Sequence, residues 1–150
     1  MPKRKMVSDY DISNSVTDVY YSRLSHKESR SFLASSDKSL TRQHKAQILL
    51  DYLCEKYDIP SMRIYIVDIP QPKKNGTTFR AFYYFNSCSV RMFNLFPNGE
   101  VVPISSLMVT VLHEFMHHYD RYYLGVESTP HTRGFFSRIK DLKFKLTDNE

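Results

Sequence analysis

The sequence has 150 residues, of which 41% are hydrophobic and 25% charged, and a formal net charge of +5. This length indicates one domain with a sizeable core, and the composition is typical of a soluble globular protein. The two cysteines, Cys54 and Cys88, are too few for a disulfide framework or a four-cysteine zinc ribbon, so we expect buried thiols in a reducing compartment.

No stretch of the sequence reaches the roughly eighteen apolar residues that a membrane-spanning helix needs. The basic run Lys3, Arg4 and Lys5 is not followed by an apolar segment, so we expect no secretory signal. These features predict an intracellular protein, in the cytoplasm or at the nucleoid or nucleus, with no membrane partner. The modest basic excess permits contact with DNA, but a basic solvated surface explains it slightly better.

Residues 1–40 are polar and serine-rich and show no sustained apolar period. This pattern predicts a flexible N-terminal arm that contains a short helix near residues 16–24. The globular domain is predicted to span residues 41–150 and to open with a helix over residues 41–57. Its apolar residues recur at helical spacing and are Ala46, Leu49, Leu50 and Leu53.

Three segments then alternate apolar and polar residues in the manner of strands. They span residues 62–69, 78–85 and 89–96. A turn at residues 73–76 separates the first two strands. We expect the three strands to form a small, mostly antiparallel sheet.

Two further helices are predicted after the strands. The first runs over residues 104–124 and ends at Gly125, and the second runs over residues 131–146 with an apolar stripe along one face. The order of helix, three strands, helix and helix predicts an α+β domain with its helices packed on the sheet.

The first of these two helices contains a His-Glu-Phe-Met-His motif at residues 113–117. His113 and His117 are four positions apart, so they project from one helical face and can share a zinc ion. Glu114 lies about 100° around the helix from His113, where it cannot easily bind the ion but can reach a water molecule on it. The spacing therefore separates two metal ligands from a general base.

The apolar run at residues 107–112 indicates that this helix is buried. Burying two histidines and a glutamate without partners is costly, and a metal ion supplies the missing partner. The competing interpretation is a solvent-facing histidine pair or a hydrogen-bonded core histidine. Of the other histidines, His118 is expected near the ligands or on the surface, and His26 and His44 on the surface.

A catalytic zinc ion usually has three protein ligands, so a third ligand must follow the motif. The metzincin spacing would need glycine and histidine at the positions of Asp120 and Tyr123, which excludes that class. His131 is the favoured third ligand, because the start of the last helix can fold back beside the metal. Glu127 and Asp120 remain alternatives, and Asp120 could instead orient a ligand histidine or pair with Arg121 or a nearby lysine.

The motif, followed fourteen residues after His117 by His131, resembles the SprT-like family of zinc metallopeptidases. The preceding order of a helix and three strands is also similar, and the resemblance covers residues 41–146. It implies a zincin-like fold and one zinc ion per chain. The implied site consists of the metal ligands His113, His117 and His131 and the catalytic residue Glu114.

The function predicted from these residues is zinc-dependent hydrolysis of peptide bonds in protein or peptide substrates, which could include DNA-associated proteins. Glu114 takes a proton from the zinc-activated water and delivers it to the leaving amine. An edge strand over residues 78–85 could bind the substrate by strand addition, although its aromatic run at residues 83–85 fits the core better. The candidates for stabilising the oxyanion are Tyr122, Tyr123 and Arg133.

Two other functions fit parts of the sequence. A DNA-binding module with structural zinc would use a basic face on the last helix, but a closed structural site leaves Glu114 without a purpose. DNA binding is therefore expected only as an addition to proteolysis. A dedicated regulatory or toxin-like zinc peptidase that cuts one protein is the other alternative, with residues 1–40 blocking the cleft. The basic residues of the last helix are Arg133, Arg138, Lys140, Lys143 and Lys145.

Overall fold

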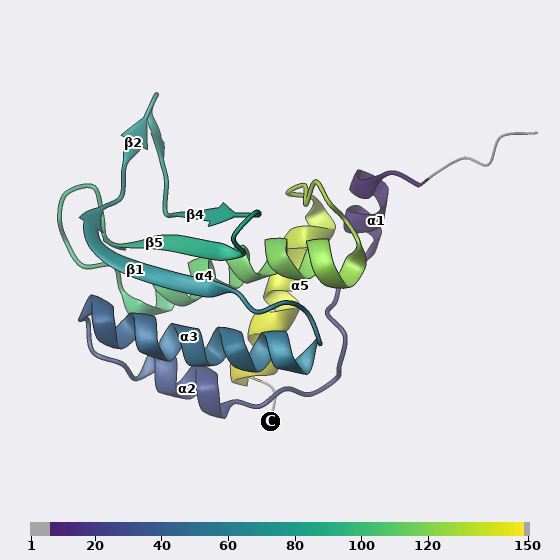
Figure 1. Ribbon diagram of the computed structural model, residues 1–150, viewed down its shortest axis with the longest axis horizontal. Helices are drawn as coiled ribbons and strands as arrows, with labels where there is room; N and C mark the ends of the chain where they lie inside the picture. The colour runs from purple at the N-terminus through teal and green to yellow at the C-terminus, as the bar shows by residue number, and fades with distance from the viewer. Residues whose placement is uncertain (1–6, 149–150) are drawn as a thin grey trace, which may run out of the picture.

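The computed structural model describes residues 7–148 (Figure 1), so the basic run at residues 3–5 lies outside the described part. The described elements are five α-helices, five strands and two π-helical turns. In chain order they are α1 (Asp9–Ser15), α2 (Lys27–Leu33), α3 (Ser39–Lys56), β1 (Arg63–Pro70), β2 (Lys73–Lys74), β3 (Thr77–Thr78), β4 (Ala81–Tyr84), β5 (Ser89–Leu95), α4 (Ile104–Tyr119), η1 (Asp120–Leu124), α5 (Arg133–Lys143) and η2 (Phe144–Asp148).

The main sheet has three strands in the order β1-β5-β4. β5 runs parallel to β1 and antiparallel to β4. The predicted α+β class is confirmed, but the sheet is mixed and not mostly antiparallel. The hairpin of β2 and β3, which projects from the body in Figure 1, explains the difference. After the hairpin the chain returns as β4, two strand positions from β1, and β5 then enters between β1 and β4.

One face of the sheet contributes to the core. β1 supplies Ile64 and Ile66, and β5 supplies their register partners Val90 and Met92. All four side chains are at most 2% exposed and belong to one cluster with the apolar residues of α3 and α4. The helix predicted over residues 41–57 is confirmed as α3, and its predicted apolar positions are buried.

Residues 7–40 do not form the expected flexible arm. Val19, Leu24 and Phe32 belong to the same core and are 2%, 7% and 0% exposed. The helices of this segment are α1 and α2, whereas residues 16–24, where a helix was expected, form irregular chain. Val19 and Leu24 enter the core singly from irregular chain, and Phe32 enters it from the short helix α2, so no sustained sequence period indicates their burial.

The helix predicted over residues 104–124 consists of α4 and η1, and it ends at Gly125, where φ is 74°. α5 begins two residues later than predicted, at Arg133, because the Thr132 hydroxyl caps its first turn. His131 therefore lies in the loop before the helix. No helix in the described range is long and apolar enough to cross a membrane.

The two cysteines have different surroundings. Cys54 on α3 is 3% exposed, and burial raises the pKa of its thiol to about 12. Cys88 lies half-buried in the turn between β4 and β5, with its Sγ 3.3 Å from the Tyr122 hydroxyl. The prediction of a buried thiol is confirmed for Cys54 and holds only in part for Cys88.

Candidate metal centre

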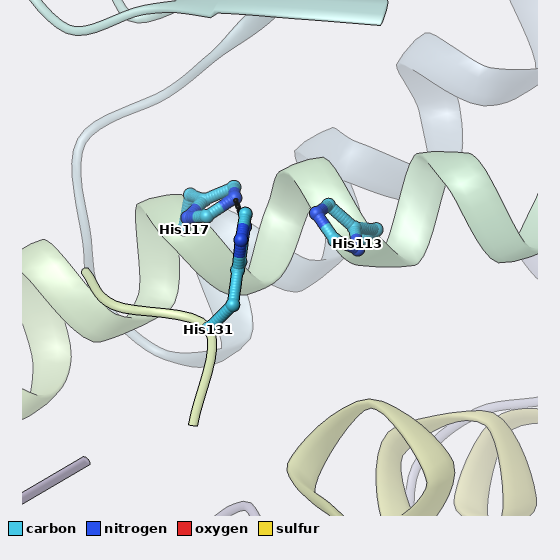
Figure 2. Close-up of side chains that lie close together, drawn as sticks. All are labelled: His113, His117 and His131. Atoms are coloured by element: carbon cyan, nitrogen blue, oxygen red, sulfur yellow. Dashed lines mark hydrogen bonds between the residues drawn. The ribbon is translucent and has the colours of Figure 1, made fainter. Parts of the chain in front are cut away.

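Three histidine side chains from two parts of the chain converge on one point (Figure 2). His113 and His117 come from α4, one helical turn apart, and His131 comes from the loop before α5. One ring nitrogen from each histidine lies within 4.8 Å of the other two. The Nε2 atoms of His117 and His131 are 3.0 Å apart. The structure thus brings together the three residues predicted as metal ligands.

Three imidazole nitrogens form a donor set that zinc accepts, as do copper, iron and nickel. Bonds of roughly 2.0–2.1 Å in a tetrahedral arrangement place ligand nitrogens about 3.3 Å apart. Burial lowers the pKa of His113 to about 4, and the nearby His131 and Arg80 act in the same direction. Burial also lowers the pKa of His117 to about 3, together with the two other histidines. Both rings are therefore neutral near pH 7, which is the form that binds metal.

Thr129 fixes the ring of His117 from the following loop. Its hydroxyl lies 2.9 Å from Nδ1 of His117, so Nδ1–H can donate to it and leave Nε2 for the metal. Thr129 is 5% exposed, and its φ of 39° lies in the left-handed region, which is uncommon for a β-branched residue. Sequence reasoning missed this residue, because the contact depends on the path of an irregular loop.

The alternative ligands lie apart from the three histidines. Glu127 is exposed and does not belong to the cluster of possible ligands. Asp120 is 0% exposed and forms an ion pair with Arg138 at 2.6 Å. Both carboxylate oxygens of Asp120 accept from Arg138, so the predicted contact with a ligand histidine and the predicted pair with Arg121 or a nearby lysine are wrong.

His118 is fully buried and bonds to neither ligand histidine. Its Nδ1 accepts a hydrogen bond from the Tyr83 hydroxyl at 2.6 Å, and its Nε2 donates to the Pro60 carbonyl at 2.5 Å. Burial lowers the pKa of His118, which favours this neutral form. The side chain therefore ties α4 to β4. His44 is exposed, as predicted, whereas His26 is half-buried.

The histidines lie in a cleft of about 700 Å³. Its lining comes from α4, from residues 78–83 and 85, and from residues 128–131. Glu114 lines the cleft, is 8% exposed, and has its pKa raised to about 7 by burial. A pKa near the working pH suits a group that takes up a proton and returns it.

The predicted oxyanion stabilisers Tyr122, Tyr123 and Arg133 do not line this cleft. Arg80, just before β4, does line the cleft, and no other lysine or arginine of the described residues does so. Its charge is close enough to lower the pKa of His113. Sequence reasoning missed Arg80, because only the folded sheet brings it to the face of α4 that carries His113 and His117.

β4 is an edge strand of the main sheet and a wall of the cleft. A β5 amide donates to the Arg80 carbonyl, and in an antiparallel pair alternate residues bond to the partner strand. Ala81 and Tyr83 therefore direct their backbone N–H and C=O groups toward the open edge. The aromatic run is not simply core, because Tyr84 is 48% exposed and Phe85 is half-buried.

Comparison with protein-family models, with curated proteins and with solved structures finds no match for this chain. The resemblance to SprT-like peptidases therefore stays a prediction from the motif and its spacing. The described residues add a histidine triad whose nitrogens are close enough to bind one metal ion.

Proposed function

We propose that this protein is a zinc-dependent metallopeptidase with a zincin-like domain of the SprT type. The observation that supports the proposal is the convergence of three histidine nitrogens in the cleft that Glu114 also lines. The third histidine comes from a different element than the motif. A motif that arose by chance in a helix gives no reason for a third metal-binding side chain to join it.

His113, His117 and His131 would hold the ion, and three protein ligands leave a coordination position for catalysis. When bound, zinc acidifies a water molecule and polarises the scissile carbonyl. Glu114 takes the proton of the attacking water and returns it to the leaving amine. Arg80 stabilises the negative charge that develops on the carbonyl oxygen.

An extended peptide is the substrate that fits this cleft best. The open edge of β4 offers the backbone groups of Ala81 and Tyr83 to a further strand. Such a strand would lie along the wall that faces the histidines. Backbone pairing gives affinity for many sequences, so protein substrates of varied sequence are the proposed class.

The described residues give little support to the two alternative functions, a DNA-binding module and a single-target peptidase blocked by residues 1–40. Of the five basic residues on the last helix, Arg138 is buried in its ion pair and Lys145 pairs with Asp141 at 2.7 Å. The expected phosphate-binding face is therefore smaller than predicted. An inhibitory arm is not favoured either, because no residue of the range 7–40 lines the cleft.

The test is to measure zinc content and cleavage of unstructured peptides on the same samples of wild type, Glu114→Gln and His131→Ala. We expect about one zinc ion per chain in wild type and in Glu114→Gln, and a clear loss of zinc in His131→Ala. Cleavage should fall about 10²- to 10⁴-fold in Glu114→Gln, because the general base is gone. Glu127→Gln is the matched control, since Glu127 is exposed and outside the triad.

Full cleavage by Glu114→Gln would overturn the proposed mechanism. Zinc retained by His131→Ala, together with zinc lost from Glu127→Gln, would move the third ligand to Glu127. Wild-type protein without zinc after reconstitution would overturn the enzyme proposal as a whole.

A further inference from the structure

We propose that α1 acts as a clamp that holds the third metal ligand in position. The clamp consists of Asp9 and Ser13, and it holds in place the loop of residues 128–132, which carries His131. Both are positioning residues, because neither lines the cleft. This inference rests on the proposed zinc site and gives the N-terminal segment a part in metal binding.

The loop needs support from outside itself. α4 fixes His113 and His117, but His131 lies in irregular chain before α5. The same loop carries Thr129, whose hydroxyl bonds to Nδ1 of His117 at 2.9 Å. Its left-handed backbone conformation persists only where the surroundings hold it. The position of this loop therefore decides the geometry at two of the three ligands.

Asp9 holds the loop before Thr129 and His131. Its Oδ2 accepts hydrogen bonds from the backbone N–H of Ser128 at 3.2 Å and from the Ser128 hydroxyl at 3.1 Å. Hydrogen bonds to a charged acceptor are stronger than neutral ones. Figure 1 shows α1, in purple, beside the light-green chain that leads into α5.

Ser13 holds the loop around and after His131. Its hydroxyl lies 2.8 Å from the Thr132 hydroxyl and 3.5 Å from the Pro130 carbonyl oxygen. The Thr132 hydroxyl accepts the Phe135 N–H, so it can donate to Ser13, which then donates to Pro130. His131 thus lies between two residues that Ser13 contacts.

The clamp is itself anchored in the protein interior. Arg138 is 0% exposed and donates to the carbonyls of Ser13 and Val16 at 2.6 and 2.5 Å. Its ion pair with Asp120 connects it to the end of α4. A Cβ at Gly134 would overlap the Ser13 carbonyl oxygen, so α1 packs directly on the backbone of α5. α1 is therefore fixed to both helices beside the metal site.

The test measures zinc binding by the full chain carrying Asp9→Ala, with Asp11→Ala as the matched control. Asp11 is an exposed acid in the same helical turn, and no described contact joins its carboxylate to the loop. Competition with a chromogenic chelator gives the Zn²⁺ dissociation constant, and the visible spectrum of the Co²⁺-loaded protein reports ligand geometry. We expect affinity to fall about 10- to 100-fold in Asp9→Ala, with a changed cobalt spectrum. Asp11→Ala should match wild type.

Two further variants separate positioning from general stability. Ser13→Ala should also weaken zinc binding, whereas Asp9→Asn should recover much of the affinity, because its amide oxygen can still accept the Ser128 hydrogen bonds. Circular dichroism and thermal unfolding of the chelated proteins report on the fold. Asp9 is only half-buried, so its variants decide the outcome even if Ser13→Ala does not fold.

Wild-type zinc affinity and a wild-type cobalt spectrum in Asp9→Ala would overturn the clamp while leaving the zinc site intact. Equal losses in Asp9→Ala and Asp11→Ala would overturn it too, because a general charge effect would then explain the result. Absence of zinc binding in the wild-type chain would overturn the proposed function and the clamp together.

Discussion

Glu114 is held where its ionised form is disfavoured, and burial raises its pKa from 4.5 to about 7. In metal-free protein the folded state therefore binds this proton more tightly than the unfolded chain does. The resulting stability is fully present below pH 4.5 and is lost as the pH rises to about 7. The Glu114→Gln variant cannot ionise at this position. Its free energy of unfolding, relative to that of wild type, should therefore increase by about 3 kcal/mol as the pH rises from 4.5 to about 7.

Urea unfolding of chelated wild type and Glu114→Gln at several pH values measures this gain. The titration of His113 and His117 is common to both proteins and largely cancels in the difference. Glu127→Gln serves as the control, because its carboxylate is exposed and its curve should follow that of wild type. A pH-independent difference between Glu114→Gln and wild type would show that burial does not perturb Glu114.

For single residues, the sequence predicts those side-chain positions that local helix geometry determines. The four-residue spacing of His113 and His117 suffices to place them together, and the sequence favours His131 as the third ligand. Thr129 and Arg80 were not predicted. Their contributions depend on a loop path and on a sheet edge, which no local spacing specifies.

The edge of β4 gives a prediction at the scale of one element. Ala81→Pro would remove an N–H that points away from β5, so the sheet should keep its hydrogen bonds while the substrate loses one. One hydrogen bond contributes about 0.5–1.5 kcal/mol, so we expect KM for peptides to rise about 2- to 10-fold with kcat little changed. Steady-state kinetics on a series of peptides measures the effect.

Phe82→Pro is the matched control for this edge. Phe82 pairs with Arg91 of β5, and its own N–H faces β5, so proline there should lower the unfolding temperature. An unchanged KM in a folded Ala81→Pro variant would argue against strand addition at β4.

The sequence indicated where the strands lie but not how they pair. Alternation of apolar residues located β1, β4 and β5 to within a few positions. The parallel pairing of β1 with β5 depends on the hairpin of β2 and β3, which determines where the chain rejoins the sheet as β4. Pairing joins residues distant in the chain, so a pattern along one strand does not encode it.

At the scale of the whole molecule, residues 7–40 belong to the same folded unit as the histidine triad. Ser29 donates to the Leu146 carbonyl at 2.8 Å, and Phe32 is 0% exposed in the shared core. The polar, serine-rich composition and the lack of an apolar period predict a flexible arm instead. Ser13 and Ser29 are fully buried and hydrogen-bonded to distant parts of the chain.

Limited digestion with trypsin distinguishes an arm from an integral segment. Arg23 and Arg30 have exposed side chains, but cleavage beside them requires Leu24 or Phe32 to leave the core, as in global unfolding. The hairpin of β2 and β3 is exposed throughout, so among the described residues we expect the first cuts after Lys73 or Lys74. Mass spectrometry of the earliest fragments reads the order of cutting, and digestion near the unfolding temperature supplies the positive control for sites in α2. Early cleavage after Arg23 or Arg30 with the remainder intact would instead show that the segment detaches on its own, and the clamp on the metal-site loop would then lack its anchor.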